Sequence, residues 1–238
     1  MDLKGKKVAV TGAGGFIGRK LLASLEERGA KITGFDLPGV KPVEGKHIRW
    51  VESDLSDESA VRAALRDAEV VFHLAFPVSD WEAEEKFTAA LKLSDLICRI
   101  AAEKAQRLVI TTSVVVYGDK IGSGQIDEST PYGKSNGFYT EYKQKQEQNA
   151  IGHFHRANLD VRIVRPANVY GAGSKPWVVE VIKVLRQGLP ALIGDGKGRA
   201  GLIHVANLVD ILLRVAEDEN SRGEIYLASD DNHVAWHT

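Results

Sequence analysis

The sequence predicts an α/β fold, in which a doubly wound parallel Rossmann sheet carries helices on both faces. Two observations support this prediction. Short apolar runs, typical of buried strands, alternate along the chain with longer segments whose apolar residues recur at helical spacing. A glycine-rich turn at 11–18 joins the first apolar run to the first helical segment. Because parallel strands need crossover connections, this alternation indicates a parallel sheet.

The glycine-rich turn has the features of a dinucleotide-binding fingerprint. Its sequence is Thr11-Gly-Ala-Gly-Gly-Phe-Ile-Gly18, between an apolar strand and an amphipathic helix. Gly12 permits the tight turn, Gly15 lets the backbone approach a pyrophosphate, and Gly18 lets the helix pack close to the sheet. The helix N-terminus then offers free N–H groups to the phosphates. An ordinary glycine turn is the alternative, and the flanking strand and helix argue against it.

An acidic residue at the end of the second expected strand indicates which dinucleotide binds. The run Lys31-Ile-Thr-Gly-Phe-Asp36 predicts a strand that ends in a carboxylate. Asp36 lies 18 residues beyond Gly18, close to the spacing at which a carboxylate accepts a hydrogen bond from the ribose 2′-hydroxyl. The same carboxylate repels a 2′-phosphate, so we expect NAD rather than NADP.

The other elements follow in order along the chain. The segment 114–138 is rich in Gly, Ser and Pro and predicts a long loop, and 188–201 is expected to be irregular. The charged stretches 82–86 and 143–147 are expected to be solvated helix faces, apart from Lys143. Strands are expected at 47–51, 69–75, 107–113, 161–165 and 224–228, and helices at 58–66, 81–104, 139–157, 175–187 and 206–217.

Composition narrows the class of protein. The 238 residues are 44% apolar and 26% charged, which is enough for a packed core. A net charge of −1 gives no support for binding nucleic acid or an anionic membrane. No apolar run is long enough to span a membrane and the N-terminus has no signal segment, so a cytoplasmic protein is expected.

The single cysteine, Cys98, excludes an internal disulfide and is expected to be a small buried residue. His153 and His155 do not share a helix face, and no metal site is predicted.

Six stretches, in the same order along the chain, resemble the extended short-chain dehydrogenase/reductase family, which includes NAD-dependent sugar epimerases and dehydratases. The resemblance implies an NAD-binding domain at 1–166, to which 206–228 adds a helix and a strand. It also implies a small, incomplete substrate lobe at 167–238, because family members usually continue well beyond Ala228. The matching stretches are Thr11-Gly-Ala-Gly-Gly-Phe-Ile-Gly18, Asp54-Leu55, His73-Leu74-Ala75, Thr112-Ser-Val-Val-Val-Tyr-Gly118, Tyr139-Thr-Glu-Tyr-Lys143 and Arg165-Pro-Ala-Asn-Val-Tyr-Gly171.

The resemblance implies a catalytic set of Ser113, Tyr139 and Lys143. Tyrosine has a pKa of about 10, and a lysine one helical turn away lowers this pKa by favouring the phenolate. A serine hydroxyl can hold the substrate oxygen during hydride transfer. An exposed Tyr–Lys helix pair and a strand-capping serine are the structural alternatives. The residues expected to contact substrate are Ser113, Val114, Asn168 and Arg199. The residues expected to contact the cofactor are Gly12, Gly15, Phe16, Ile17, Gly18, Asp36, Asp54, Leu55, Leu74, Ala75, Tyr139, Lys143 and Pro166.

Two tyrosines compete for the catalytic assignment. Tyr132 begins a Tyr-Gly-Lys-Ser stretch with wording common in the family, but the residue four positions later is the uncharged Asn136. Tyr139 has Lys143 four positions later, on the same helix face. Tyr139 also lies 26 residues from both Ser113 and Arg165, spacings like those of the family. We therefore predict that Tyr139 is the acid/base.

The chain departs from the family pattern in three places. Alanines 89 and 90 stand where the family commonly has an asparagine in the long helix. Arg199 is one position early and Asn207 replaces an acid in the stretch that nucleotide-sugar members use, which disfavours diphosphate recognition. Val114 and Val115 replace the Asp-Glu pair of the dehydratases, so no 4,6-dehydratase activity is expected.

These features lead to one hypothesis of function and two alternatives. The leading hypothesis is an NAD-dependent epimerase/dehydratase-family oxidoreductase that acts on a sugar or nucleotide-sugar by tyrosine-assisted hydride transfer. The first alternative is an NAD-dependent reductase or dehydrogenase of a smaller or more apolar alcohol or ketone. The second is a non-catalytic NAD-sensing or scaffold protein. The helices expected at 81–104 and 139–157 resemble the pair that forms a homodimer interface in the family.

Overall fold

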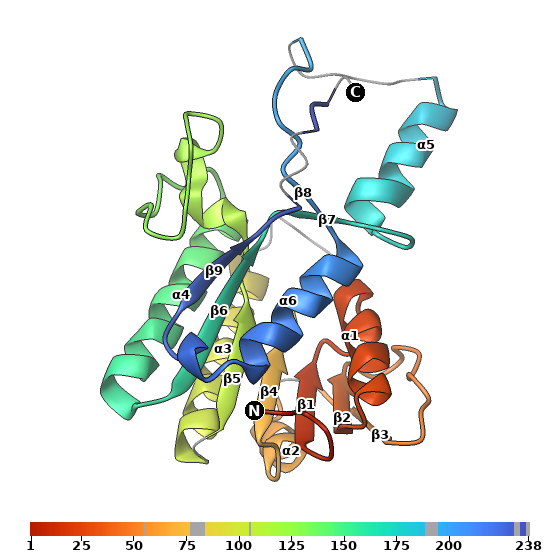
Figure 1. Ribbon diagram of the computed structural model, residues 1–238, viewed down its shortest axis with the longest axis vertical. Coiled ribbons are helices and arrows are strands. Elements are labelled where there is room, and N and C mark those ends of the chain that lie inside the picture. The colour runs from red at the N-terminus through yellow and green to blue at the C-terminus, as the bar shows by residue number, and fades with distance from the viewer. Residues whose placement is uncertain (55, 77–83, 105, 189–194, 231–233, 237–238) are drawn as a thin grey trace.

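The main sheet of the protein is parallel and doubly wound. The computed structural model describes residues 1–54, 56–76, 84–104, 106–188, 195–230 and 234–236. Within these ranges the main sheet has seven strands in the order β3-β2-β1-β4-β5-β6-β9, all parallel (Figure 1). The chain runs outward from β1 to β3 and then returns to the other side of β1, which confirms the predicted Rossmann arrangement. The strands are β1 Lys7–Thr11, β2 Lys31–Asp36, β3 Ile48–Glu52, β4 Val70–His73, β5 Arg107–Thr111, β6 Asp160–Pro166 and β9 Ile225–Ala228.

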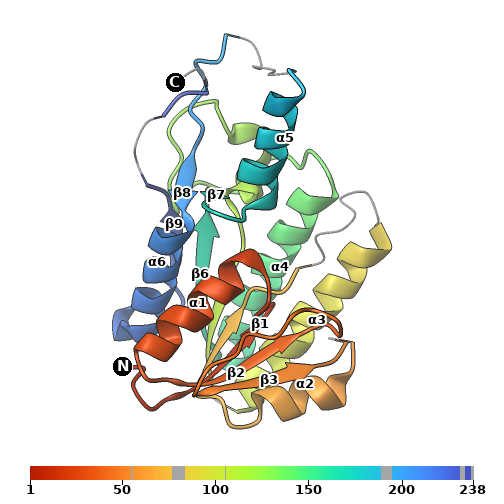
Figure 2. The same cartoon turned by 90° about the vertical axis from the view of Figure 1, so that its right-hand side faces the viewer.

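Helices cover both faces of this sheet (Figure 2). On one face, Val8 and Val10 of β1 share a core with Leu21 and Leu25 of α1. On the other face, alternate residues such as Ala9 join a second core. The first face carries α1 Phe16–Glu27 and α6 Val205–Glu217, and the second carries α2 Glu58–Leu65, α3 Glu84–Glu103 and α4 Phe138–Ala157.

Local signals in the sequence explain several helix positions. The Asp57 carboxylate caps α2 by accepting hydrogen bonds from the N–H groups of Ser59 and Ala60, at 2.9 and 3.1 Å. Cys98 of α3 is fully buried, as predicted, and burial raises the pKa of its thiol to about 12. None of the helices in the described part of the chain is long and apolar enough to cross a bilayer.

The structure differs from the predicted elements beyond β5. The expected loop at 114–138 begins with a 3-10 helix, Val114–Lys120. Two short parallel strands, β7 Asn168–Tyr170 and β8 Leu202–His204, form a second sheet that the sequence did not predict, because three residues are too few to reveal a period. The helix expected at 175–187 divides into a π-helical turn, Lys175–Val179, and α5 Glu180–Arg186. The prediction for 81–83 falls outside the described residues.

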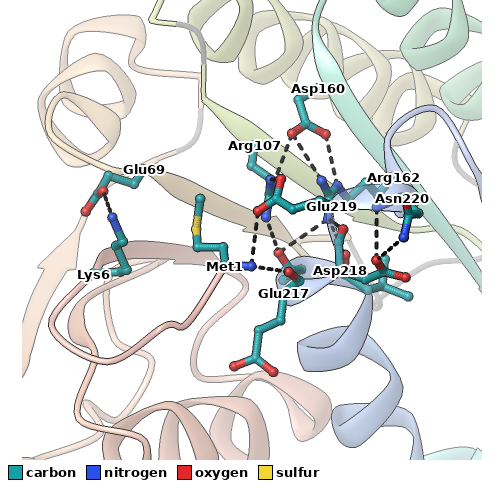
Figure 3. Close-up of polar contacts among 12 residues, drawn as sticks. Met1, Lys6, Glu69, Arg107, Asp160, Arg162, Glu217, Asp218, Glu219 and Asn220 are labelled. Atoms are coloured by element: carbon teal, nitrogen blue, oxygen red, sulfur yellow. Dashed lines mark hydrogen bonds and ion pairs between the residues drawn. The ribbon is translucent and has the colours of Figure 1, made fainter.

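Two arginines join the sheet to the C-terminal end of α6 (Figure 3). The Arg162 side chain is fully buried and donates to the carbonyls of Val215 and Ala216, at 2.5 and 3.3 Å. Arg107 donates to the Ala216 carbonyl at 2.6 Å. Both guanidinium groups also donate to the Asp160 carboxylate, at 2.9 and 3.0 Å. These contacts satisfy carbonyls that a helix end leaves without partners and place positive charge at the negative end of the helix dipole.

Replacing Arg162 should therefore destabilise the fold strongly. Arg162→Met leaves buried carbonyls and part of the Asp160 charge without donors, and we expect a loss of about 2–4 kcal/mol in the free energy of unfolding, measured by urea denaturation. The matched control is Arg214→Met, because the Arg214 side chain is 75% exposed and pairs with Asp210, one turn earlier on α6. That variant should change the free energy by less than about 0.5 kcal/mol. Equal effects in the two variants would contradict this account of the buried arginine.

Candidate active site

The strand order of the sheet reverses at β1 and β4, whose carboxyl ends lie side by side. The Leu74 N–H donates to the Thr11 carbonyl at 3.2 Å, which continues the pairing beyond the two strands. Gly12 has a φ of +71°, and a Cβ placed on it would lie 2.8 Å from the backbone nitrogen of Ala75. Only glycine fits this position, because both the backbone angle and the space exclude a side chain. Open α/β sheets bind ligands at this point, where the strand order reverses.

The glycine-rich turn delivers the chain directly into α1. Gly15 is the N-cap residue of α1, and no side chain caps this helix end. A Cβ on Gly18 would lie 2.2 Å from the Gly12 carbonyl oxygen, so glycine is also required there. The roles predicted for Gly12 and Gly18 in the local fold are therefore met. An uncapped helix N-terminus beside a tight glycine turn suits a pyrophosphate group.

Asp36 lies beside this turn, at the end of β2. Its carboxylate accepts hydrogen bonds from the N–H groups of Gly14, at 2.7 Å, and Leu37, at 2.8 Å. The side chain remains half-buried. Asp54 follows β3 and is exposed, and a hydrogen bond from the Ser56 N–H lowers the pKa of its carboxyl group. Leu55, predicted to contact adenine, lies outside the described residues.

The other residues predicted on the cofactor side lie at the same edge of the sheet or in its core. Phe16 is half-buried at the start of α1, and a Cβ on Gly171 would lie 3.5 Å from its ring. Ile17 and Leu74 pack against the core that α1 and α6 share, so they anchor the two ends of this region to the hydrophobic core. Ala75 is 8% exposed beside Gly12. Pro166 is the last residue of β6, paired in register with Ala228.

The three residues predicted to be catalytic come together at the end of β5 and the start of α4. Ser113 is the N-cap residue of the 3-10 helix, and its hydroxyl accepts a hydrogen bond from the Val115 N–H at 3.3 Å. Ser113 lies close enough to Tyr139 for its hydroxyl to lower the pKa of the tyrosine. Lys143 lies one helical turn after Tyr139, with its Nζ atom 6.0 Å from the centre of the tyrosine ring.

Lys143 is buried and held by neutral partners. Its Nζ atom donates to the Thr111 carbonyl and to Gln146 Oε1, both at 3.1 Å. The Gln146 amide in turn donates to the Ser94 hydroxyl of α3 at 3.3 Å. Burial lowers the pKa of Lys143 to about 7, although the Glu147 carboxylate acts in the opposite direction. The prediction that Gln146 belongs to a solvated face is wrong, because this side chain is 1% exposed.

This geometry changes the expected ionisation of Tyr139. The sequence suggested that Lys143 lowers the pKa of the tyrosine. In the structure, burial raises the pKa of Tyr139, and the hydrogen bond from Ser113 only partly offsets this rise. The Lys143 ammonium group donates to the Thr111 carbonyl and to Gln146.

A neutral histidine lies beside the buried lysine. His73 ends β4, and its Nδ1 atom is hydrogen-bonded to the Thr11 hydroxyl at 2.8 Å. Burial, together with the charge of Lys143, lowers the pKa of His73 to about 3. The imidazole is therefore neutral at physiological pH and adds no positive charge to the site.

Tyr132, the competing tyrosine, belongs to a different cluster. Its hydroxyl donates to the Glu147 carboxylate at 2.9 Å. Glu147 is fully buried and also forms an ion pair with Arg165 and accepts from the Thr112 hydroxyl at 3.0 Å. Burial and the Glu147 charge raise the pKa of Tyr132 strongly. The prediction that Glu147 is solvated is wrong, because sequence spacing could not reveal its ion pair with a residue of β6.

The residues predicted to contact substrate are only partly gathered. Val114 is half-buried directly after Ser113. Asn168 begins β7, and its side-chain amide donates to the Ala200 carbonyl at 2.7 Å. Arg199 is exposed, and its backbone forms an isolated bridge with Ala235. Asn168 and Arg199 therefore lie near each other in the second sheet region, whereas Val114 lies with the catalytic set.

The lowered pKa of Lys143 predicts how stability depends on pH. An unfolded lysine has a pKa of about 10.4, so between about pH 7 and 10 the folded protein binds fewer protons than the unfolded chain. Folding stability should therefore rise with pH across this window, by on the order of 1.4 kcal/mol per pH unit from this residue. Urea denaturation at several pH values should show this rise in the wild type and its loss in Lys143→Met. The control Lys145→Met, at an exposed position, should behave like the wild type. If stability depended on pH in the same way in all three proteins, the lowered pKa of Lys143 would be contradicted.

Comparisons with known proteins agree with this fold and turn. The model of the NAD-dependent epimerase/dehydratase family matches residues 8–228. Two related proteins are 2-alkyl-3-oxoalkanoate reductase of Stenotrophomonas maltophilia and UDP-glucuronic acid decarboxylase 2 of Arabidopsis thaliana. The first is 27% identical over 84% of this chain and 62% of its own length. The second is 28% identical over 91% of this chain and 52% of its own length. The chain thus spans between about half and two thirds of these relatives.

A solved structure shares the fold at low sequence identity. The epimerase Mth375 of Methanothermobacter thermautotrophicus superposes with a TM-score of 0.87 at 18% identity, covering 98% of this chain and 74% of the other. At that identity the likeness concerns the fold alone. The family match, in contrast, extends over nearly the whole chain and includes the glycine-rich turn, Ser113, Tyr139 and Lys143. The chain belongs to the NAD-dependent epimerase/dehydratase family.

Proposed function

We propose that this chain forms the cofactor-binding and catalytic part of an NAD-dependent oxidoreductase that acts on a carbon bearing a hydroxyl or ketone group. The observation that carries the proposal is the grouping of Ser113 beside Tyr139, with Lys143 one turn further along α4. Family membership supports an enzyme of this type. Because the matched relatives are longer, the activity of a whole protein is part of this proposal.

The cofactor would bind at the carboxyl ends of β1 and β4. Its pyrophosphate would lie on the Gly12–Gly18 turn, and its adenine ribose would bind the Asp36 carboxylate. The close approach of Gly12 to Ala75 leaves the backbone bare at this point, which supports the fit. Lys143 would donate to the nicotinamide ribose, exchanging one of its present partners for a ribose hydroxyl. When bound, NAD supplies or accepts the hydride.

The residues of the chain would handle the proton and the substrate oxygen. Tyr139 would take the proton from the substrate hydroxyl during oxidation and return it during reduction. Ser113 would hold the same oxygen by a hydrogen bond, which its position beside Tyr139 favours. The nearby positive charges of Lys143 and of the oxidised nicotinamide would lower the pKa of Tyr139, against the effect of burial.

The surroundings of Ser113 favour a smaller or more apolar alcohol or ketone as substrate. Val114 and Val115 are half-buried next to the serine, so the reacting carbon would meet apolar side chains. The reductase from S. maltophilia, named for an alkyl-substituted oxoalkanoate, is consistent with such a substrate. A nucleotide-sugar is the second candidate, and the Arabidopsis decarboxylase, named for UDP-glucuronic acid, supports it.

Thermal stability can separate the two substrate classes. A ligand that binds only the native state raises the unfolding midpoint. With NAD present, short-chain secondary alcohols and β-keto acids should raise the midpoint of this protein, whereas UDP- and GDP-sugars should have little effect. A larger shift with a nucleotide-sugar than with any apolar ligand would reverse the preferred substrate class.

Replacing the two tyrosines separately tests the catalytic assignment. Tyr139→Phe should lower the rate of NAD reduction by roughly two to four orders of magnitude, because the acid/base is lost. Titration calorimetry should find NAD binding nearly unchanged in this variant. Tyr132→Phe is the matched control, and its rate should fall far less, because Tyr132 bonds Glu147 rather than Ser113. If Tyr132→Phe were the more damaging change, the assignment would be wrong.

No turnover of any alcohol or ketone by the wild type, with NAD bound, would favour a sensing or scaffold role.

Cofactor preference follows from the position of Asp36. We expect tighter binding of NAD than of NADP, because the carboxylate repels a 2′-phosphate and accepts from a 2′-hydroxyl. Asp36→Asn should narrow the preference by about tenfold, since it removes the charge while keeping the size. Titration calorimetry with both dinucleotides measures the two affinities, and equal affinities in the wild type would defeat this prediction.

A further inference from the structure

A basic groove lies at the amino ends of the strands, whereas the glycine-rich turn lies at their carboxyl ends. Lys7 and Lys31 are the first residues of β1 and β2, Arg49 is the second residue of β3, and Arg66 ends α2. These four side chains line a cavity of about 510 Å³. We call it the amino-edge groove, because it lies at the amino ends of the strands, whereas the cofactor crevice lies at their carboxyl ends.

The strand register places the cations on one face of the sheet. Lys7 pairs directly with Lys31, and Arg49 pairs with Thr33, two residues beyond Lys31. Lys7, Lys31 and Arg49 alternate with core residues of the α1 face, so they lie on the face that α2 covers, and Arg66 is the C-cap residue of α2 itself. Like charges at directly paired positions destabilise a sheet. The arrangement therefore concentrates positive charge where packing alone gives no reason for it.

Acidic residues near the groove do not neutralise this charge. Asp67 also lines the groove, and it reaches Lys7 at 3.8 Å. Glu69 is engaged elsewhere, because its carboxylate accepts from Lys6 Nζ at 2.7 Å and from the Lys7 backbone N–H at 3.1 Å (Figure 3). Within the described ranges, Lys31, Arg49 and Arg66 form no ion pair.

The contrast with other arginines of the chain supports a specific role. Arg62, on the same helix as Arg66, bonds both Glu58 and Glu103, and Arg99 and Arg214 each pair with an acid one turn earlier on their own helix. The chain as a whole carries a net charge of −1, so the groove does not reflect a generally basic protein. Four cations and one carboxylate therefore form a local excess of positive charge.

The groove also has room for a ligand. Between the cations it is lined by the short side chains of Ala63, Ala64 and Ala68, which leave the space unfilled. Thr33 adds a hydroxyl group to the lining. A volume of about 510 Å³ is within the range of small-molecule sites. Arginine forks and lysine ammonium groups together suit phosphate oxygens, which accept several charge-assisted hydrogen bonds at once.

We propose that the amino-edge groove is a binding site for a small polyanion that carries two or more phosphate groups. Such a ligand places its charge between Lys31, Arg49 and Arg66 and relieves the repulsion between Lys7 and Lys31. The site is separate from the cofactor crevice and does not depend on the function proposed above.

Titration calorimetry with inorganic tripolyphosphate tests this site on protein saturated with NAD, so that the glycine-rich turn is occupied. We expect saturable binding of one tripolyphosphate per chain, with weaker binding of citrate. The double variant Arg49→Gln/Arg66→Gln should lose at least about tenfold in affinity, since two charge-assisted contacts are removed. Arg49 and Arg66 are both exposed, so replacing them should not disturb the core. An unfolding midpoint equal to that of the wild type, measured without ligand, would verify that the double variant folds.

The matched control removes two cations elsewhere on the surface. Arg99→Gln/Arg214→Gln changes the net charge by the same amount, and its affinity for tripolyphosphate should equal that of the wild type. Equal losses in the two double variants would mean that only general electrostatics acts, which would overturn the proposal. Binding that disappears when NAD is added, or that survives unchanged in Arg49→Gln/Arg66→Gln, would overturn it as well.

Discussion

The buried ion pair between Glu147 and Arg165 fixes the position on which the candidate active site depends. Glu147 is on α4 and Arg165 is on β6, and both side chains are almost completely removed from solvent. An unpaired charge at this depth is very unfavourable, so the pair tolerates little movement of α4 relative to the sheet. Because Tyr139 and Lys143 lie on the same helix, two turns and one turn before Glu147 respectively, the ion pair also sets their distance from Ser113.

The same cluster extends to the segment that follows Ser113. Arg165 donates to the Tyr117 hydroxyl at 2.9 Å and to the Glu128 carbonyl at 3.1 Å. The Glu128 carboxylate accepts from the Leu227 N–H of β9 at 2.8 Å. One guanidinium group therefore connects α4, the 3-10 helix, the loop at 127–128 and the edge of the sheet. The Tyr132 hydroxyl belongs to this network because it donates to the Glu147 carboxylate, whereas Tyr139 lies beside Ser113.

The two ends of the parallel sheet differ in how they present charge. At the carboxyl ends, Lys143 is buried among neutral partners, and Asp36 accepts hydrogen bonds from the backbone N–H groups of Gly14 and Leu37. At the amino ends, Lys31, Arg49 and Arg66 remain open to solvent around a groove. Crossover helices cover the two faces of a parallel sheet. Ligands can therefore reach the sheet at the amino ends or the carboxyl ends of its strands.

Local patterns in the sequence were enough to predict the fold class and the tight glycine turn between β1 and α1. Alternating apolar runs and helical segments fixed a parallel sheet, and Gly12 and Gly18 marked a turn whose shape leaves no space for a side chain. The spacing of Tyr139 and Lys143 also needed no tertiary information, because residues four apart share a helix face. Tertiary structure alone decided what surrounds those residues. Glu147 and Gln146 look like solvated positions in a polar helix, yet partners on β6 and α3 bury them. The same burial sets the pKa values of Lys143 and Tyr139, since desolvation depends on neighbours that are distant in the sequence.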